Sequence, residues 1–305
     1  MSIPRRRPAP RPVRARRALL APGLAILGLL AAACVPSPPV GGVEDPNPLR
    51  STLIANHWGR HLEPTLTDVA YGLGPQHRLD VLRTTSATSR GTIVFVHGGG
   101  FVMGDKSQLL AGQNGAIVYQ HTRGWDIVSV GYTIGEGTYP AGYHDVALAV
   151  SWVKEQGAEL GLDTSTVVLA GHSAGAALTS MVATTAGATT PYGEVPRVDR
   201  WVAVAGFHDF VDGTAYLTEP WGLPVADRPT TSPLGQLDAS DPRGYLIHGD
   251  ADPIVRPLQS DRMRERATVV GADVRYDLVD SGPMSCRMHD PLCGANLSAL
   301  NSFLS

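Results

Sequence analysis

A serine in a glycine-rich turn is the first feature of this sequence that could do chemistry. Residues 171–175 read "GHSAG", a G-x-S-x-G pentapeptide that follows the apolar run "TVVLAG" and precedes an alanine-rich segment. Glycines on both sides of the serine permit a sharp turn from a strand into a helix, which would lift the hydroxyl above the edge of a sheet. The start of that helix would present free N–H groups to a negatively charged oxygen. The pattern therefore predicts that Ser173 is a nucleophile for acyl transfer.

A second glycine cluster offers what such a serine needs. Residues 97–100 read "HGGG" and directly follow the apolar run "TIVFV". Acyl transfer places negative charge on the former carbonyl oxygen, and backbone N–H groups stabilise it where no side chain blocks their approach. In a nucleophile elbow one donor is the residue after the serine, here Ala174, and another comes from a loop of this HGGG type. We interpret the three glycines as part of an oxyanion hole, with His97 shaping the loop through hydrogen bonds.

Together these motifs resemble a known superfamily. "HGGGF" and "GHSAG" are similar to the α/β-hydrolases, in particular to carboxylesterases related to hormone-sensitive lipase and to their feruloyl-esterase-like neighbours. The resemblance covers the chain from about residue 75 to the C-terminus. One departure is Ala176, where many relatives have a further glycine. The resemblance implies that Gly99 and Gly100 are the loop donors of the oxyanion hole and that Ala174 is the third donor.

The resemblance also implies that an acid follows the serine. The segment "HGDADPIV" is similar to the HG-x-x-D-x-x-V pattern of the superfamily, and this similarity selects Asp252 as the acid. Asp250 is the alternative, and Asp209 is a more distant one. In Ser-His-Asp triads such an acid orients the imidazole and stabilises its protonated form.

The base should follow the acid in the chain. Three histidines lie after Ser173, at positions 208, 248 and 289. His208 precedes the acid and His248 lies in the acid's own strand. His289 follows the last predicted strand, in the order and place that the resemblance implies, so we predict that it is the base.

These residues must be positioned by a sheet. Short runs rich in β-branched residues alternate with longer amphipathic or alanine-rich segments, and several runs are apolar throughout, as in strands buried on both faces of a parallel sheet. This alternation predicts an α/β fold, which the resemblance specifies as an α/β-hydrolase fold with a mostly parallel central sheet flanked by helices on both faces. The predicted strands are residues 77–83, 92–97, 126–132, 166–171, 201–206, 244–249 and 274–280, and the predicted helices are residues 105–121, 143–159, 174–187, 255–271 and 294–304.

We expect residues 51–305 to form a single domain. Within it, residues 207–241 are rich in Pro, Gly and Thr and fit neither a strand nor a helix well. This segment could be a lid or insertion over the site, or a long loop.

The N-terminus has the composition of an export signal. Seven arginines precede the apolar run "ALLAPGLAILGLLAAAC", which is too short to span a membrane comfortably. The end of this run resembles the bacterial lipobox, in which the cysteine, here Cys34, is lipidated and becomes the first mature residue. Ordinary signal cleavage beside an incidental cysteine is the alternative. We predict a signal peptide over residues 1–33 and a Pro- and Gly-rich tether over residues 34–50. The protein would be exported and lipid-anchored to the outer face of the bacterial cell membrane, or otherwise secreted.

Charge and cysteines narrow the class further. Residues 1–33 contain seven arginines and no acidic residue, so the formal net charge of −3 becomes −10 without them. Such an acidic body argues against nucleic-acid partners. Cys286 and Cys293 bracket His289, and an exported protein can oxidise them to a disulfide that stiffens the loop around the base; two free thiols are the alternative. No His/Cys spacing resembles a metal site, and we expect neither a metal nor a cofactor.

The predicted function is that of a serine carboxylesterase that hydrolyses small or aromatic esters through an acyl-enzyme intermediate. Its partner would be a small-molecule ester, and its oligomeric state stays open. One alternative is an amide or formamide hydrolase, because kynurenine-formamidase-like proteins share both motifs. Another is a binding module with a silent site, which a complete Ser/Asp/His set disfavours. Phe101, Tyr216 and Trp221 could line the substrate pocket or belong to the core.

Overall fold

A computed structural model describes residues 62–110, 114–212, 215–282, 284–292 and 294–305. The predicted signal peptide, Cys34 and the tether lie outside these residues, as does Cys293. Within the described part of the chain, no helix is long and apolar enough to cross a membrane.

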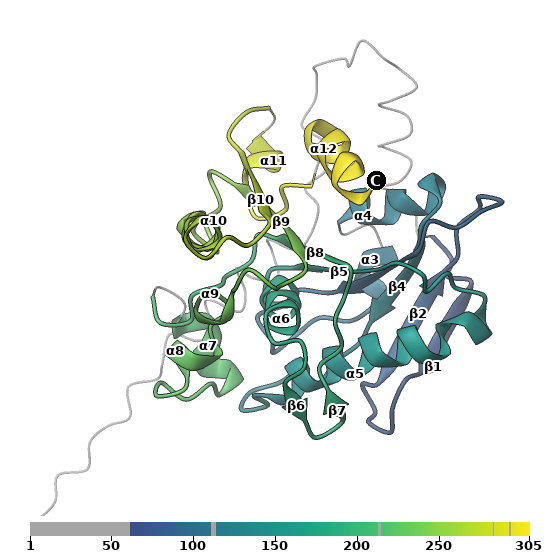
Figure 1. Cartoon of the computed structure of the whole chain (residues 1–305), viewed down its shortest axis with the longest axis horizontal. Coiled ribbons are helices and arrows are strands. Elements are labelled where there is room, and N and C mark those ends of the chain that lie inside the picture. Colours follow the sequence, from purple (N-terminus) through teal and green to yellow (C-terminus); the bar gives the residue numbers. More distant parts are fainter. Residues whose placement is uncertain (1–61, 111–113, 213–214, 283, 293) are drawn as a thin grey trace, which may run out of the picture.

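An eight-stranded sheet forms the centre of the molecule (Figure 1). Its spatial order is β1-β2-β4-β3-β5-β8-β9-β10. β1 and β2 are antiparallel to each other, β2 is antiparallel to β4, and the remaining neighbours are parallel. The strands are β1 (Leu66–Ala70), β2 (Arg78–Leu82), β3 (Thr92–Val96), β4 (Asp126–Val130), β5 (Val167–His172), β8 (Arg200–Val204), β9 (Arg243–Gly249) and β10 (Val274–Val279).

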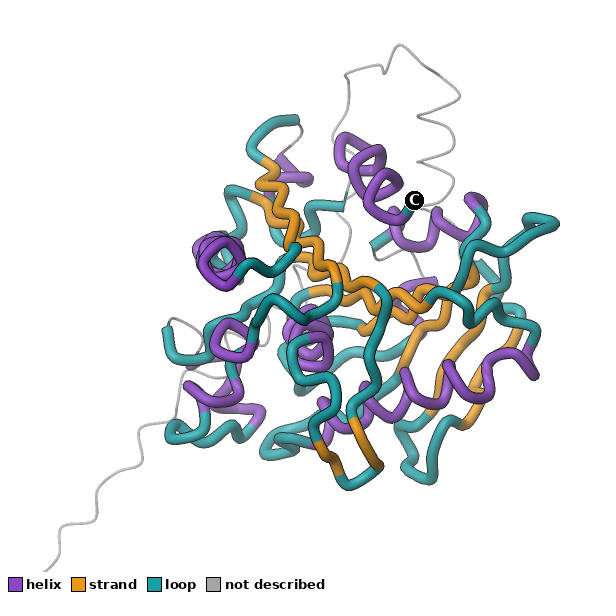
Figure 2. The backbone as a smooth tube through the Cα atoms, viewed as in Figure 1, coloured by secondary structure: helices purple, strands orange, loops and turns teal. Residues whose placement is uncertain are grey.

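Helices cover both faces of this sheet (Figure 2). One face packs against α5 (Ala141–Gln156), α6 (Ala174–Ala183) and α10 (Leu258–Val270). The other packs against α3 (Ser107–Leu110), α4 (Gly115–Val118) and the C-terminal α12 (Gly294–Leu304). Two short 3₁₀ helices, η1 (Tyr119–Arg123) and η2 (Gly157–Leu160), follow α4 and α5. The predicted mostly parallel sheet between two helical layers is therefore confirmed.

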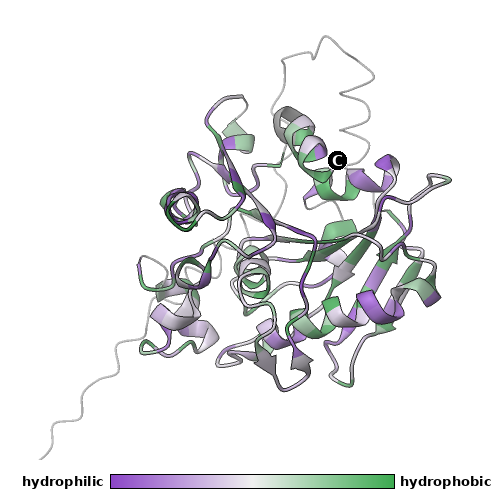
Figure 3. Ribbon diagram, viewed as in Figure 1, coloured by the Kyte–Doolittle hydropathy of each residue, from purple (hydrophilic) through white to green (hydrophobic). Residues whose placement is uncertain are grey.

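The central strands are hydrophobic on both sides because both sides are covered. Every residue of β3, β4 and β5 is buried, and alternate residues enter the two halves of the core: Val94 and Val96 face one layer, whereas Ile93 and Phe95 face the other. Figure 3 shows the hydrophobic colours gathered at the centre of the molecule. All seven predicted strands are present. The edge strand β1 was not predicted, because its sequence "LTDVA" is largely exposed and carries no core pattern. The two-residue strands β6 (Thr189–Thr190) and β7 (Gly193–Glu194), which pair with each other, were not predicted either.

The single helix predicted for residues 105–121 is wrong. The structure has α3, α4 and η1 in this region instead. Asn114 precedes α4 with φ 53° and ψ 44°, a left-handed conformation that interrupts a right-handed helix. Asparagine tolerates this conformation better than most residues, so a helix break occurs here without a proline.

The described residues between 207 and 241 form three short helices. They are α7 (Ala215–Trp221), α8 (Arg228–Thr231) and α9 (Pro233–Gln236). The Trp221 ring stacks on the Phe101 ring with centroids 3.9 Å apart, and both side chains are fully buried in the core. Tyr216 is partly exposed, and its hydroxyl donates a hydrogen bond to the carbonyl of Ile254. The segment is thus partly built into the core, and its role as a lid stays a prediction.

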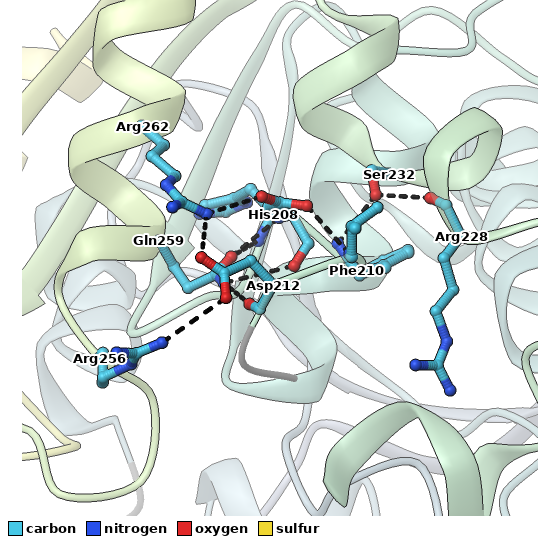
Figure 4. A network of polar contacts seen from close by, with 10 residues as sticks. His208, Phe210, Asp212, Arg228, Ser232, Arg256, Gln259 and Arg262 are labelled. Atoms are coloured by element: carbon cyan, nitrogen blue, oxygen red, sulfur yellow. Dashed lines mark hydrogen bonds and ion pairs between the residues drawn. The ribbon is translucent and has the colours of Figure 1, made fainter. Parts of the chain in front are cut away.

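Hydrogen bonds and ion pairs connect the start of this segment to α10 (Figure 4). The Gln259 side-chain oxygen accepts hydrogen bonds from the backbone N–H groups of His208 (2.9 Å) and Asp209 (2.8 Å), and its amide donates to the carbonyl of Asp212 (2.8 Å). Arg262 forms ion pairs with Asp209 at 2.9 Å and with Asp212 at 2.6 Å. Asp209, the most distant candidate for the acid, is therefore engaged with a surface arginine.

Candidate active site

Ser173 lies in a strained turn between a strand and a helix. β5 ends at His172 and α6 begins at Ala174, and Ser173 between them has φ 54° and ψ −119°. A positive φ in a residue other than glycine costs about 1–3 kcal/mol, so the surrounding structure must enforce it. The backbone N–H of Ser173 donates a hydrogen bond to the carbonyl of Val204 on the neighbouring strand β8, at 2.9 Å. The serine is thereby held at the carboxyl edge of the parallel strands.

The two glycines of the pentapeptide make this turn possible. A Cβ atom on Gly171 would lie 2.3 Å from the carbonyl oxygen of Gly175. A Cβ atom on Gly175 would lie 2.1 Å from the carbonyl oxygen of Val96 on β3. Real Cβ atoms do not approach backbone this closely, so any side chain would push α6 away from the sheet. The sequence pattern thus has a steric reason in the packing of α6 against β3 and β5.

The HGGG loop lies directly beside the serine. A Cβ atom on Gly98 would be 3.1 Å from the Cβ atom of Ser173. Gly99 has φ 120°, and a Cβ atom there would lie 2.0 Å from the carbonyl oxygen of Met103. Gly100 follows with φ 61°. Glycine is therefore required at position 99 both for its conformation and for space.

Three backbone N–H groups of the HGGG loop and the serine turn have no backbone acceptor among the described residues. The carbonyl of Gly99 accepts hydrogen bonds from the N–H groups of Val102 (3.2 Å) and Met103 (3.1 Å), which closes the loop into a turn. Among the described residues, no backbone carbonyl accepts the N–H of Gly99 or Gly100. Ala174 is the first residue of α6, so its N–H has no partner within the helix. These are the three donors that the resemblance implies for the oxyanion hole, and that role stays a prediction.

His97 holds this loop from within. Its Nδ1–H donates a hydrogen bond to the carbonyl of Gly98 at 2.8 Å. The Tyr132 hydroxyl donates to the carbonyl of His97 at 2.9 Å, and the two rings stack with centroids 4.4 Å apart. Burial lowers the pKa of His97 to about 4, so the ring is neutral near pH 7. The expected loop-shaping role of His97 is confirmed by these contacts.

Asp252 and His289 form a buried hydrogen-bonded pair. His289 Nδ1–H donates a hydrogen bond to Asp252 Oδ2 at 2.7 Å, and both side chains are buried. Asp252 Oδ1 accepts hydrogen bonds from the backbone N–H groups of Ile254 (2.8 Å) and Val255 (3.0 Å). Burial would raise the pKa of this carboxyl, but the hydrogen bonds from His248 and His289 outweigh it and hold the pKa well below its ordinary value. Asp252 is therefore a carboxylate at any working pH.

The remaining nitrogen of His289 has no hydrogen-bond partner among the described residues. Because Nδ1 carries the proton that binds Asp252, Nε2 has a free lone pair, and it is buried. His289 lies beside the elbow, since its ring is 4.8 Å from the ring of His172, the neighbour of Ser173. A hydrogen bond between Ser173 Oγ and His289 Nε2 is not formed in this structure. Such bonds are often long before substrate binds.

The alternatives considered from the sequence have other partners. Asp250 forms a two-pronged ion pair with Arg287, with N–O distances of 2.7 Å and 2.5 Å. His208 is buried, and its Nδ1 lies 3.1 Å from Ser180 Oγ on α6. Among these candidates, His289 contacts Asp252 and neither Asp250 nor Asp209.

His248 has a position that the sequence did not reveal. Its Nε2–H donates to the carbonyl of Val255 at 2.8 Å and lies 3.2 Å from Asp252 Oδ2. Its Nδ1 is 2.7 Å from Ser260 Oγ on α10, which donates to it. The side chain considered as a possible base therefore supports the acid. Its place four residues before Asp252 at the end of β9 was the available signal.

Of the two cysteines of the predicted disulfide, Cys286 lies among the described residues. Cys286 is buried in α11 (Met284–Arg287), whereas its predicted partner Cys293 lies outside the described residues, so the pairing stays a prediction. In the described part of the chain, no group of three or more His, Cys, Asp or Glu side chains is arranged to hold a metal ion.

The fold and the site first define a class. A mostly parallel eight-stranded sheet, a strained serine between strand and helix, and a His–Asp pair at the same edge constitute an α/β-hydrolase. The chain belongs to the BD-FAE family, whose model matches residues 79–267.

Three curated relatives illustrate the range of the family's neighbours. The chain is 26% identical over 245 residues to the esterase LipC of Mycobacterium tuberculosis. The aligned region covers 70% of this chain and 60% of LipC. It is 28% identical over 250 residues to the probable carboxylic ester hydrolase LipM of the same organism, covering 73% of this chain and 56% of LipM. It is 33% identical over 171 residues to the kynurenine formamidase of Danio rerio, covering 53% of each chain. The chain thus spans less than two thirds of each of these relatives.

Solved structures agree on the fold. A truncated carbohydrate esterase from gut microbiota superposes with a TM-score of 0.68 at 21% sequence identity, covering 78% of this chain and 94% of that one. The apo form of Thermogutta terrifontis esterase 2 superposes with a TM-score of 0.64 at 19% identity, covering 78% and 93%. At such identities the likeness concerns the fold.

Proposed function

We propose that this protein is a carboxylic ester hydrolase that works through an acyl-enzyme on Ser173. The observation that carries the proposal is the convergence of three parts at one edge of the sheet. These parts are the strained serine, the Asp252-bound His289 with its free Nε2, and the N–H groups of the HGGG loop. The names of LipC and LipM, an esterase and a carboxylic ester hydrolase, support the same chemistry.

Acylation uses each part once. Ser173 Oγ attacks the ester carbonyl carbon while His289 Nε2 takes its proton. The oxyanion that forms accepts hydrogen bonds from the N–H groups of Gly99, Gly100 and Ala174, each worth roughly 3 kcal/mol of barrier. The imidazolium is stabilised by the Asp252 carboxylate. His289 then gives the proton to the leaving alcohol, and the acyl group remains on Ser173.

Deacylation repeats these steps with water. His289 takes a proton from the water as it attacks the acyl carbonyl carbon, and the same N–H groups accept the second oxyanion. The carboxylic acid leaves as the proton returns to Ser173 Oγ. Every proton transfer in both halves is accounted for by His289, so this sequence of steps calls for no cofactor.

Small or aromatic esters are the substrates we propose. The test is a panel of p-nitrophenyl esters of increasing acyl length beside feruloyl esters, with Ser173→Ala as the control. We expect turnover on this panel that disappears in Ser173→Ala. Turnover that survives in Ser173→Ala, or none on any ester, would contradict the proposal.

Formamide hydrolysis is the second candidate. It is favoured by the 33% identity to a kynurenine formamidase over 171 residues. The same oxyanion donors and base serve an amide carbonyl, except that His289 must protonate an amine as it leaves. Adding N-formylkynurenine to the substrate panel separates the two, since kcat/KM for formamide and ester can be compared on one preparation.

We also propose that the mature chain is exported and carries lipid on Cys34. The lipobox-like "LLAAAC" and the tether after it support this proposal. One acyl chain binds a membrane only marginally, so the modification should carry at least two. The protein expressed with its full N-terminus should partition into detergent, and Cys34→Ser should release it. An unmodified N-terminus at any other residue, seen by mass spectrometry, would contradict the proposal.

A further inference from the structure

His172 contacts the proposed base although it belongs to the proposed nucleophile's strand. It is the last residue of β5 and precedes Ser173. Its Nε2 lies 2.8 Å from the carbonyl oxygen of His289, 117 residues further along the chain. Because a carbonyl only accepts, the Nε2–H of His172 is the donor. The two rings also lie against each other, with centroids 4.8 Å apart and planes inclined by 57°.

His172 is enclosed on its other side by the oxyanion loop. A Cβ atom on Gly98 would lie 3.1 Å from His172 Nδ1 and 3.1 Å from the carbonyl oxygen of His172. The side chain is buried, and burial together with the neighbouring His289 lowers its pKa to about 3. The imidazole is therefore a neutral donor across the working pH range. It lies between the elbow, the HGGG loop and the loop that carries His289.

Three contacts hold the segment around His289 to the end of β9 and the loop after it. The N–H of Ala251 donates to the carbonyl of Arg287 at 2.8 Å, Asp250 pairs with the Arg287 side chain, and Asp252 accepts from His289 Nδ1. All three contacts come from the residues that follow β9. The bond from His172 ties the His289 backbone to β5, the strand that carries Ser173.

We propose that His172 is a positioning residue that sets the distance between His289 Nε2 and Ser173 Oγ. This inference rests on the proposed function, because it concerns the proton transfer between these two groups. His172 acts through the backbone of His289. Its loss should change the rate of the chemical step more than the binding of substrate.

Two substitutions separate hydrogen bonding from packing. His172→Leu fills similar space without a donor, whereas His172→Gln offers an amide N–H at about the reach of Nε2. We expect His172→Leu to lower kcat by about 10- to 100-fold with little change in KM, because small misplacements of reacting groups cost rates of this size. We expect His172→Gln to recover most of that loss. The rate of labelling by a fluorophosphonate, which needs an activated serine, should follow the same order.

A matched control is His121→Leu. His121 is also a buried imidazole whose Nδ1–H donates to a backbone carbonyl, that of Val118, at 2.8 Å. It lies in η1, before the start of β4 and so away from the carboxyl ends of the strands. Its substitution should lower stability and leave kcat unchanged.

The outcomes are distinguishable. Equal kcat in wild type and folded His172→Leu, or equal losses in the Leu and Gln variants, would overturn this inference and leave the proposed function intact. A wild type that neither turns over esters nor reacts with the fluorophosphonate would overturn both. If His172→Leu does not fold, His172→Asn replaces it, because its shorter amide cannot reach the His289 carbonyl; activity equal to that of the Gln variant would then overturn the inference.

Discussion

Two regions of the site are held in place in different ways: the HGGG loop, called here the oxyanion side, and the Asp252–His289 pair, called here the acid–base side. On the oxyanion side, the loop from His97 to Gly100 is shaped by backbone conformation, with positive φ at Gly99 and Gly100 and no room for a Cβ atom at Gly99. On the acid–base side, side chains do the holding: Asp252 accepts hydrogen bonds from two imidazoles and two backbone N–H groups. One side is therefore sensitive to added atoms, and the other to lost hydrogen bonds and charge.

The largest expected loss of kcat comes from a substitution on the acid–base side. Asp252→Asn should lower kcat by about 10⁴-fold, because an amide cannot hold the imidazole in the tautomer that leaves Nε2 free. Asp250→Asn is the matched control: it removes a partly exposed ion pair with Arg287, which contributes little because solvent screens it, and should leave kcat within a few-fold of wild type. Steady-state kinetics on a p-nitrophenyl ester decides between them. An active Asp252→Asn beside an inactive Asp250→Asn would show that the acid is wrongly assigned.

The next largest effect breaks the oxyanion side. Gly99→Ala adds a Cβ atom that would lie 2.0 Å from the Met103 carbonyl oxygen, so the loop must move and its N–H groups with it. Loss of an oxyanion donor costs about 10²- to 10³-fold in kcat. Gly187→Ala is the control, since Gly187 has φ 86° but no atom within 4 Å of an added Cβ. It should share the backbone strain and keep its activity. Equal kcat in the two variants would remove Gly99 from the oxyanion hole.

Acid pH should lower the free energy of unfolding, because the folded protein buries imidazoles that are neutral. Burial lowers the pKa to about 4 for His97 and to about 3 for both His172 and His208, against about 6.5 in an unfolded chain. Between these values the unfolded state binds more protons, so the free energy of unfolding falls as pH falls from about 6.5 toward 4. Each such histidine contributes up to about 1.4 kcal/mol per pH unit.

Below the ordinary carboxyl range a further loss follows. The pKa of Asp252 is held below its unfolded value, so the stability it contributes is lost as pH falls through about 4 and below.

Denaturant unfolding of wild type and His208→Gln between pH 4 and 8 checks the histidine part. The free energy of unfolding of the variant should depend less steeply on pH than that of wild type. Identical pH dependence would contradict the assignment of His208 as a neutral buried group.

The smallest expected effect on turnover concerns the predicted Cys286–Cys293 disulfide. A bond closing a loop of about eight residues stabilises by roughly 2.5 kcal/mol on the chain-entropy model. Reduction should therefore lower Tm by about 5–10 °C. It should lower turnover only modestly, since His172, Asp252 and Ala251 already hold the loop of the base. Non-reducing peptide mapping comes first, and two alkylatable thiols in the native protein would end the idea.

The sequence predicts the oxyanion side better than the acid–base side, and the reason is physical. The glycines at 98–100, 171 and 175 fall within two short motifs, so their spacing within a few residues is informative even though Gly98 and Gly175 also meet distant segments. The supports of His289 and Asp252 are different. The bond between His172 and His289 joins residues 117 apart, and the bond from Ser260 to His248 depends on how α10 packs against β9. Only the folded sheet brings these groups together.

The same distinction explains the fold. The buried strands β3, β4 and β5 are mostly apolar on both faces and could be recognised, because both of their faces are covered. The edge strand β1 could not, because pairing with β2 rather than burial defines it. The helix predicted over residues 105–121 was broken by the left-handed backbone of Asn114, which hydrophobic periodicity does not report.

One measurement tests the central claim, that Ser173 is the nucleophile which His289 activates. Native protein is treated with a fluorophosphonate, the adduct is located by tandem mass spectrometry, and its rate of formation is measured in wild type, Ser173→Ala and His289→Ala. The account predicts one adduct per chain on Ser173, none in Ser173→Ala, and labelling slowed by at least about 10³-fold in His289→Ala. An adduct on another residue, or labelling of His289→Ala at the rate of wild type, would contradict it.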